Sequence, residues 1–367
     1  MGPAEPPRAL HRLVAELWPG ARIERCEPLG PDPGGGVAAK SEGYGRPLRV
    51  SVREASGAER AIVFRTQVPN EFGHDRRADR MGGVLLAYDV FPLVPDHVAA
   101  LDVGALLPGG GFASLRGAGE PYLVTGWAEG RLYAEDLREV AQRGEALPRD
   151  VARCELLARW LAALHRRHAE GAAPAQVRWR RALRDLVGHG EGVFGIADAY
   201  PDGVPGAPPE RLERIERLCL AWRWRLRGRV ERLTRTHGDF HPFNIVLAPD
   251  DRLTLLDASR GGEGDPADDV TALTVNYVFF AIDRRQAWAR GFGPLWRRFW
   301  ATYLGESGDR GVLETAAPFL AWRTLVVSCP RFYPGLSPAG RDALLGLAER
   351  ALESPAFDPA WAEEPFR

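Results

Sequence analysis

Lysine is almost absent from this sequence, because Lys40 is the only one among its 48 lysine and arginine residues. Methionine is equally scarce, with Met1 and Met81 alone. This skew indicates a coding bias towards arginine, alanine and glycine rather than a function. It has one consequence for a functional site, since a catalytic lysine can be missing from this chain for that reason alone.

The small number of cysteines and apolar runs excludes several classes of protein. Cys26, Cys154, Cys219 and Cys329 lie far apart with no C-x-x-C, so we expect neither a zinc site nor a disulfide framework. This cysteine usage favours the cytoplasm. We expect no membrane partner, because the N-terminus lacks an apolar signal core and the longest apolar stretch, around 272–282, is too short to span a bilayer.

The chain also lacks a strong net charge of either sign. The formal net charge is -1 and 26% of residues are charged, so no global basic field attracts nucleic acid, and we expect no such partner. The chain has 367 residues, of which 45% are hydrophobic. This length suits two ordinary domains, and this composition excludes disorder or a coiled coil as a description of the whole chain.

Strand patterns come first in the chain and helical patterns follow. The front is expected to hold a helix at 8–18, a hairpin of 48–54 and 61–65 with its turn at 56–58, a helix at 72–88 and a strand at 121–126. The back is expected to hold helices at 149–168 and 210–234, a small hairpin of 245–247 and 253–256, and mostly helix from 266 to 351, broken at Pro294, Pro318, Pro330 and Pro334. The sequence therefore predicts an α+β fold.

The strongest chemical signal is the segment 236–257, which reads THGDFHPFNIVLAPDDRLTLLD. Asp239 lies in its H-G-D, Asn244 follows within a short turn, and Asp257 comes directly after the second predicted strand. Phosphoryl transfer needs a carboxylate that orients the acceptor hydroxyl, and oxygen ligands for magnesium. We predict that Asp239 is the catalytic residue and that Asn244 and Asp257 hold Mg²⁺.

This segment resembles the aminoglycoside phosphotransferase and choline kinase-like family, whose loop has the pattern H-G-D-x-H-x-x-N. Residues 264–269, GDPADD, are similar to the family's G-D-P-x-x-D. The resemblance implies a two-lobed protein-kinase-like fold, with a small β-rich lobe and a larger helical lobe. It also implies a small-molecule kinase that uses Mg²⁺ and ATP or GTP to phosphorylate a hydroxyl group.

The resemblance further implies how the chain is divided. We expect an N-terminal nucleotide-binding lobe at 1–125, a hinge at 126–130, and a helical lobe with the catalytic loop and acceptor site at 131–367. Thr125 and Trp127 would lie at the hinge beside the nucleotide base. The resemblance also gives structural roles within the loop region: His237 and His241 brace the loop, Asp265 and Asp269 cap a helix or tie the loop in place.

The N-terminal lobe departs from the family pattern. The family carries a lysine on its third strand, paired with a helix acid, and this chain has Arg65 there. Arginine keeps the charge but differs in geometry. The helix acid is Asp79 or Asp75, and we favour Asp79, although the same charge run also suits a solvated helix face.

The loop over the phosphates is less clear from the sequence, because no G-x-G-x-x-G is present. Gly43 and Gly45 are preferred over residues 34–36, since they immediately precede a predicted strand and glycine permits close approach of backbone N–H groups.

The acceptor is not disclosed by the sequence, and oligomeric state is open. Candidate acceptor-site segments and residues are 178–184, 188–200, Trp222 and Trp224, with Glu191, Asp198, Asp202 and Glu263 as possible acids for a polycationic aminoglycoside. Neighbouring arginine-rich stretches weigh against an aminoglycoside. Two alternatives are a nucleotide-binding regulatory pseudokinase and, less favoured, a non-catalytic helical scaffold.

Overall fold

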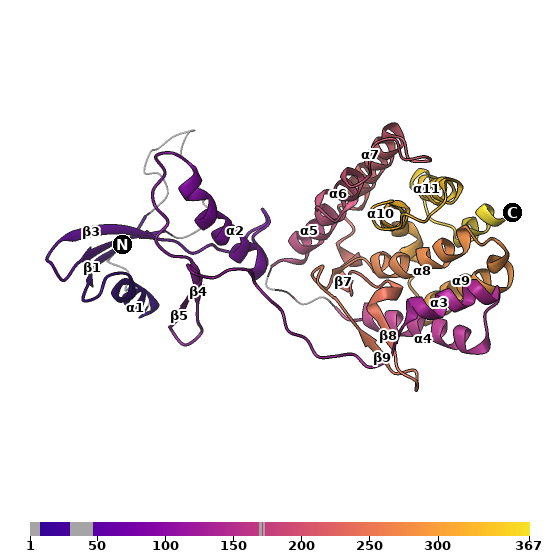
Figure 1. The fold of residues 1–367 in the computed structure, drawn as a ribbon, viewed down its shortest axis with the longest axis horizontal. Helices are drawn as coiled ribbons and strands as arrows, with labels where there is room; N and C mark the ends of the chain where they lie inside the picture. Colours follow the sequence, from indigo (N-terminus) through magenta and orange to yellow (C-terminus); the bar gives the residue numbers. More distant parts are fainter. Residues whose placement is uncertain (1–7, 30–46, 169–170, 172) are drawn as a thin grey trace. The chain divides into compact units, whose positions relative to one another are not determined.

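The computed structural model describes residues 8–29, 47–168, 171 and 173–367 (Figure 1). The chain divides into two compact units, Met1–Thr125 and Gly126–Arg367. Each unit has its own hydrophobic core. Gly43 and Gly45, expected over the phosphates, lie outside the described residues.

The N-terminal unit contains an antiparallel sheet in the order β1–β2–β3, formed by β1 (Arg22–Pro28), β2 (Leu48–Arg53) and β3 (Glu59–Phe64). Val50 and Val52 of β2 alternate towards α1 (Arg8–Leu17) and are buried with its apolar residues Leu10 and Val14. Alternating apolar residues around a glycine-containing turn are what a half-buried hairpin requires. The predicted helix and hairpin are therefore confirmed.

The rest of this unit consists of short elements: α2 (Arg77–Val90), η1 (Phe91–Leu93), β4 (Gly104–Leu106) and β5 (Phe112–Ser114). The helix predicted from residue 72 begins at Arg77 instead, where the Asp79 carboxylate accepts the N–H of Arg76 at 2.9 Å and caps the first turn. The strand predicted at 121–126 is wrong. No described strand pairs with this segment, and Tyr122 and Leu123 are exposed.

The C-terminal unit is mainly helical. Its helices are α3 (Tyr133–Arg143), α4 (Pro148–His165), α5 (Ala175–Gly188), α6 (Val193–Asp198), α7 (Pro209–Leu226), η2 (Val230–Arg232), η3 (Pro242–Asn244), α8 (Pro266–Ile282), η4 (Trp288–Phe292), α9 (Gly293–Ser307), α10 (Gly311–Ser328), α11 (Pro338–Glu353) and η5 (Pro359–Phe366). Its strands are β6 (Arg131–Leu132), β7 (Thr234–Arg235), β8 (Ile245–Leu247), β9 (Leu253–Leu255) and β10 (Glu263–Gly264).

Helix α8 is the centre of this unit. Most of its residues are buried, as expected of a helix that is apolar on every side. It packs against α10 and α11 on one side and against α3, α4 and α9 on the other (Figure 1). None of the helices in the described ranges is both long and apolar enough to cross a bilayer.

Two predicted helix boundaries in this unit are wrong. The helix expected to reach residue 234 ends at Leu226, because Gly228 follows and the chain turns through η2. Pro318 was expected to break a helix, yet it lies inside α10. It is buried there with its neighbours, and packing of the helix offsets the hydrogen bond that proline cannot donate.

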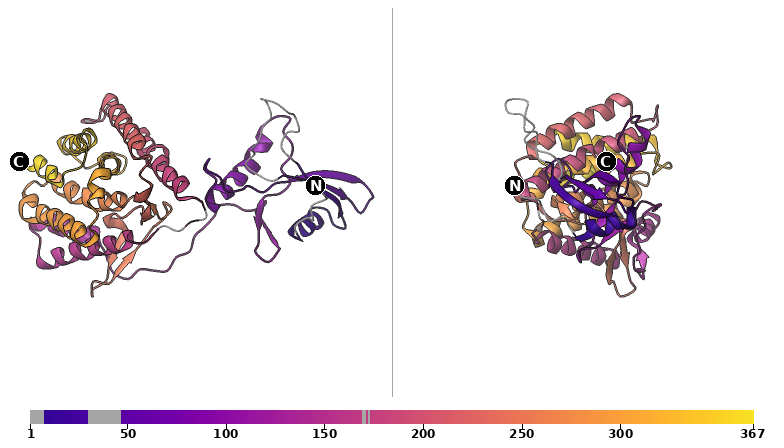
Figure 2. Two further views of the ribbon diagram at one scale, coloured as in Figure 1. Left: turned by 180° about the vertical axis from the view of Figure 1, so that it is seen from behind. Right: turned by 90° about the vertical axis from the view of Figure 1, so that its left-hand side faces the viewer.

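Short paired strands flank the segment 236–257 at both ends. β7 pairs with β10, and β8 pairs with both β6 and β9, all antiparallel. The predicted hairpin of β8 and β9 is confirmed, and it lies at the edge of the unit opposite α7 (Figure 1, Figure 2). The ladder continues one step further, since the N–H of Leu256 donates to the carbonyl of Asn244 at 2.9 Å.

Candidate active site

The loop between β7 and η3 is fixed by the first turn of α8. The carboxylate of Asp269 accepts the N–H groups of His237 and Gly238, each at 2.8 Å. Gly238 has φ of +83°, and a Cβ at this position would lie 3.1 Å from the Cβ of Arg260. The loop therefore needs glycine here, both for its left-handed backbone and for the close approach of Arg260.

The residues expected to support the loop do so. Asp269 is fully buried and also contacts Nε2 of His165 at 3.1 Å, while Asp265 caps α8 by accepting the N–H of Ala267 at 2.9 Å. The ring Nδ1 of His237 accepts the N–H of Asp239 at 3.2 Å. Nδ1 of His241 accepts the N–H of Phe243 at the same distance. Both histidines thus brace the loop through backbone groups.

Asp239 is buried and accepts contacts on both carboxylate oxygens. Its Oδ1 accepts a hydrogen bond from Nη1 of Arg323 at 2.6 Å. Its Oδ2 accepts a longer one from Nδ2 of Asn244 at 3.3 Å and lies 3.5 Å from Nε2 of His241. Nε of Arg260 lies 3.7 Å from Oδ1. Two guanidinium groups, an amide and an imidazole therefore surround this carboxylate.

These neighbours set the charge of Asp239. Burial alone would raise the pKa of its carboxyl, but the His241 ring and the positive charges of Arg323 and Arg260 outweigh it and hold the pKa well below its ordinary value. Asp239 is therefore a carboxylate at neutral pH. A group with such low proton affinity is suited to hold a hydroxyl by accepting its hydrogen bond, rather than to remove its proton beforehand.

Asn244 and Asp257 offer oxygen atoms from adjacent positions of the β8–β9 ladder. Nδ2 of Asn244 donates to the carbonyl and the carboxylate of Asp239, so the amide oxygen points the other way. Asp257 follows the residue that pairs with Asn244, has φ of +51° and is exposed. A carboxylate and an amide oxygen fit Mg²⁺, which commonly completes its shell with phosphate oxygens and water. In the described part of the chain no cluster of three His, Cys, Asp or Glu side chains forms a metal site.

The candidates from the front of the chain lie on separate segments. Arg65 directly follows β3 and is exposed. The Asp79 carboxylate caps α2 by accepting the N–H of Arg76, and the expected pairing of Arg65 with Asp79 stays a prediction. Thr125 ends the N-terminal unit, and Trp127 is 87% exposed in a stretch without regular structure.

Two of the acidic residues considered for binding a polycationic acceptor form ion pairs with arginines. Glu191 forms an ion pair with Arg260 at 3.0 Å, and Glu263 forms one with Arg178 at 2.7 Å. The aromatic candidates differ as well, because Trp222 is buried, whereas Trp224 is exposed with arginines against its ring. The surroundings of the loop thus offer a polycation fewer free carboxylates than the sequence suggested.

Three residues near Asp239 were missed by sequence reasoning: Arg260, Trp322 and Arg323. Arg260 and Arg323 lie against the Trp322 ring, at 5.1 and 3.8 Å from its centroid to the guanidinium carbon. In a chain with this many arginines neither one stands out, and Arg323 belongs to a helix far from the loop in sequence. Only the packing of α10 beside α8 brings it to Asp239.

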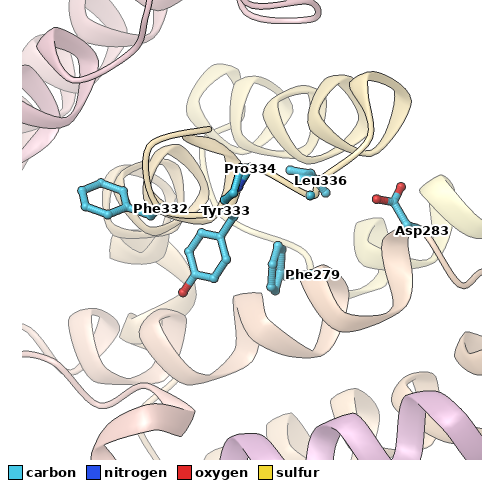
Figure 3. Close-up of a pocket in the computed structure, with 7 residues that line it drawn as sticks. Phe279, Asp283, Phe332, Tyr333, Pro334 and Leu336 are labelled. Carbon is cyan, nitrogen blue, oxygen red and sulfur yellow. The ribbon is translucent and has the colours of Figure 1, made fainter.

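A separate hollow of about 290 Å³ lies between the end of α8 and the loop that joins α10 to α11. It is lined by Phe279, Asp283 and residues 332–336. Figure 3 shows the Tyr333 ring beside that of Phe279, and their centroids are 4.7 Å apart. None of the predicted site residues lines this hollow.

Comparison with known proteins agrees with this geometry. The sequence model of the phosphotransferase enzyme family matches residues 92–302, which is more than half of the chain. Similar solved structures include a glucosamine kinase (15% identity over 95% of this chain and 91% of that chain, TM-score 0.39) and an aminoglycoside phosphotransferase from Streptomyces rimosus (17%, 82% and 92%, 0.33). A choline kinase from Streptococcus pneumoniae is also similar (14%, 94% and 97%, 0.34). No curated protein matches the chain.

The buried loop carboxylate of Asp239, on a helical unit that follows a β-containing unit in the chain, suits the class of phosphotransferases. The chain belongs to the phosphotransferase enzyme family. It is therefore a phosphotransferase, and its α+β fold is divided into the two units expected from the sequence.

Proposed function

We propose that this enzyme transfers the γ-phosphoryl group of ATP or GTP to the hydroxyl group of a small molecule, with Mg²⁺ as cofactor. The observation that supports this most is the loop itself. It combines the buried Asp239 with Asn244, and Asp257 directly follows Leu256, whose N–H donates to the carbonyl of Asn244. Because the cysteines suit a reducing compartment, we also propose that the enzyme acts in the cytoplasm.

Asp239 orients the acceptor in this proposal. Within the described residues its Oδ2 has only the two long contacts with Asn244 and His241, so it can accept the hydrogen bond of an acceptor hydroxyl. The hydroxyl oxygen attacks phosphorus while the bond from phosphorus to the bridging oxygen of the nucleotide breaks. The hydroxyl proton passes to the Asp239 carboxylate as positive charge develops on the attacking oxygen.

Asn244 and Asp257 are proposed to bind the metal. A Mg²⁺ ion held there would neutralise the negative charge of the nucleotide phosphates. Asn244 is suited to this because its amide nitrogen is already committed to Asp239, which fixes the direction of its oxygen.

The N-terminal unit is proposed to bind the nucleotide. Arg65, steadied by Asp79, would contact phosphates, and an arginine can hold two phosphate oxygens at once. Thr125 and Trp127 remain the candidates beside the base, and Gly43 and Gly45 those over the phosphates.

The experiment that tests this function compares wild type with Asp239→Asn. Release of ADP or GDP is followed with pooled acceptors in three classes, namely neutral sugars, amino alcohols with aminoglycosides, and hydroxy acids. We expect one class to stimulate release in wild type. Asp239→Asn should lower that rate by about 10²–10⁴-fold, since general acid–base and orienting groups commonly contribute this much, while nucleotide affinity stays near that of wild type.

Nucleotide binding supplies the second arm of this experiment. Asp257→Asn should weaken magnesium-dependent nucleotide binding, and unchanged binding would remove Asp257 from the metal site. If no acceptor class stimulates release and Asp239→Asn equals wild type, the proposed transfer is wrong. Tight binding without turnover would then favour the regulatory alternative, to which neither the family nor the intact loop gives support.

A further inference from the structure

Arg323 of α10 is a buried arginine whose hydrogen bonds all reach the catalytic loop or the helix turn behind it. Only 5% of it is exposed. Nη1 donates to Oδ1 of Asp239 at 2.6 Å, and Nη2 donates both to the carbonyl of Gly238 at 2.7 Å and to Oδ1 of Asp268 at 2.6 Å. One planar guanidinium group therefore joins the Asp239 carboxylate, its backbone and the first turn of α8.

The neighbouring Trp322 side chain helps to fix the position of this guanidinium group. The Trp322 ring lies 3.8 Å from the guanidinium carbon, and the indole N–H of Trp322 donates to the carbonyl of Glu191 at 2.7 Å. Nε of Arg323 is buried without a hydrogen-bond partner in the described part of the chain. Hence the hydrogen bonds that orient Arg323 are those of its two terminal nitrogens, which face the loop. A buried charge is costly unless it is paired, so the arrangement depends on the Asp239 and Asp268 carboxylates.

The two oxygens of Asp239 are consequently unequal. Oδ1 has a short, charge-assisted bond with Arg323, which is the stronger kind. In the part of the chain that the structure describes, Oδ2 has only the contacts of 3.3 Å with Asn244 and 3.5 Å with His241. The carboxylate can turn about its Cβ–Cγ bond, and the bond with Arg323 is the shortest contact that stops this rotation.

We propose that Arg323 is a positioning residue for phosphoryl transfer, which holds Oδ1 of Asp239 so that Oδ2 faces the acceptor hydroxyl. This inference rests on the proposed function of Asp239. Arg323 acts through that carboxylate and contacts neither the nucleotide nor the acceptor. Its loss should therefore lower kcat and leave nucleotide binding largely intact.

The test uses Arg323→Lys, Arg323→Gln and Arg323→Ala in the full chain. Misplacement of a catalytic group by about 1 Å costs about 10²-fold in rate, so we expect Arg323→Gln and Arg323→Ala to lose about that much kcat. The KM for nucleotide should stay within a few-fold of wild type. Arg323→Lys keeps the charge but not the planar fork, and it should lie between wild type and Arg323→Gln. Added methylguanidinium should restore part of kcat in Arg323→Ala.

Arg153 provides the matched control. It is also buried, with 4% exposed, and it also joins two carboxylates, those of Asp136 and Asp251. It belongs to α4, and among the described residues none of its ion pairs reaches a candidate site residue, since Asp251 lies in the β8–β9 turn at the end of the hairpin away from Asn244. Arg153→Lys and Arg153→Ala should lower the thermal stability as the Arg323 variants do. They should keep the wild-type kcat per folded molecule and should not respond to methylguanidinium.

Each outcome of this test decides the proposal. A folded Arg323→Gln or Arg323→Lys with wild-type kcat overturns it. A loss of kcat that follows the folded fraction, is equal in the Arg153 variants and is not rescued also overturns it, because the role is then structural. If wild type itself shows no acceptor-dependent turnover, the proposed function of Asp239 fails first, and the inference that rests on it fails with it.

Discussion

His237 lies beside Asp239 in the loop, and its environment opposes a positive charge. It is buried, and its Nδ1 is occupied as the acceptor for the N–H of Asp239. Burial lowers the pKa of this ring, and the nearby carboxylates of Asp269 and Asp239 only partly oppose this. The folded protein therefore resists a proton that the unfolded chain accepts at its ordinary pKa of about 6.5.

This difference predicts how stability changes with pH. Because the folded pKa of His237 is the lower one, its contribution is fully present above about pH 6.5 and is lost as the pH falls below that value. Urea denaturation of the C-terminal unit should show a declining free energy of unfolding between about pH 7.5 and 5.5. In His237→Asn the decline should be shallower, because Asn offers an acceptor near the position of Nδ1 and takes up no proton.

The exposed His11 of α1 supplies a control at the same substitution, and His11→Asn should keep the dependence of wild type. If His237→Asn and wild type have the same slope, His237 does not contribute to the pH dependence. Turnover is measured alongside, because Asp239 is bound to the same ring.

At the level of single residues, the sequence predicts those members of the site that lie in one segment. Asp239, Asn244 and Asp257 are separated by short turns and strands, and local rules bring them together. Arg323 and Trp322 could not be found in this way, because helix packing places them there. Asp79 shows what the family pattern leaves out, since its carboxylate also accepts a backbone N–H at the start of its own helix.

At the scale of elements, the start of α8 contacts several other elements of the C-terminal unit in addition to being capped. Asp265 is fully buried, accepts the N–H of Ala267 and the hydroxyl of Thr315, and forms two hydrogen bonds with Arg232. The same helix turn carries Asp269, which holds the catalytic loop. The position of the loop therefore depends on how this helix begins.

Asp265→Ala should be strongly destabilising for this reason. It removes a cap and leaves the buried Arg232 with Asp309 as its remaining carboxylate partner. Breaking a buried ion pair costs about 3–5 kcal/mol, and urea denaturation should show a loss of that order. Asp265→Asn keeps an acceptor for the Ala267 N–H and should lose less.

The exposed cap Asp358 separates the two contributions. Its carboxylate accepts the N–H of Ala360 at 2.9 Å at the start of η5, so Asp358→Ala should cost about 0.5–2 kcal/mol, as other helix caps do. Equal losses in Asp265→Ala and Asp358→Ala would show that the ion pair with Arg232 adds nothing.

Among the elements, those with a complete local signal were predicted and those that depend on partners were not. Both hairpins follow from alternating residues around turns, and Pro148 at the first position of α4 marks its start. The segment 121–126 has strand-forming residues but no strand beside it within the described residues. Conversely, Pro318 is tolerated inside α10 because packing in the core offsets the hydrogen bond that proline cannot donate. Sequence rules for proline take no account of tertiary packing.

For the whole molecule, the division into two units was expected from the change of pattern along the chain, and the cores of the two units differ greatly in size. In the described residues, the cluster of the N-terminal unit contains only Leu10, Val14, Cys26, Val50 and Val52 as buried members. The cluster of the C-terminal unit is many times larger and is built from residues 133–362 alone. Since buried apolar area is the main stabilising contribution, the two units should differ in stability.

The last prediction concerns the two fragments. Residues 126–367 should fold alone and unfold cooperatively in urea, because the described members of their core all lie between residues 133 and 366. The midpoint by tryptophan fluorescence should lie close to that of the same unit in the full chain. Residues 1–125 should show a weak transition at lower urea, since so small a cluster only marginally offsets the conformational entropy of its chain. A fragment 126–367 that lacks a cooperative transition would mean that its core needs the N-terminal residues, and the two units would then be one folding domain.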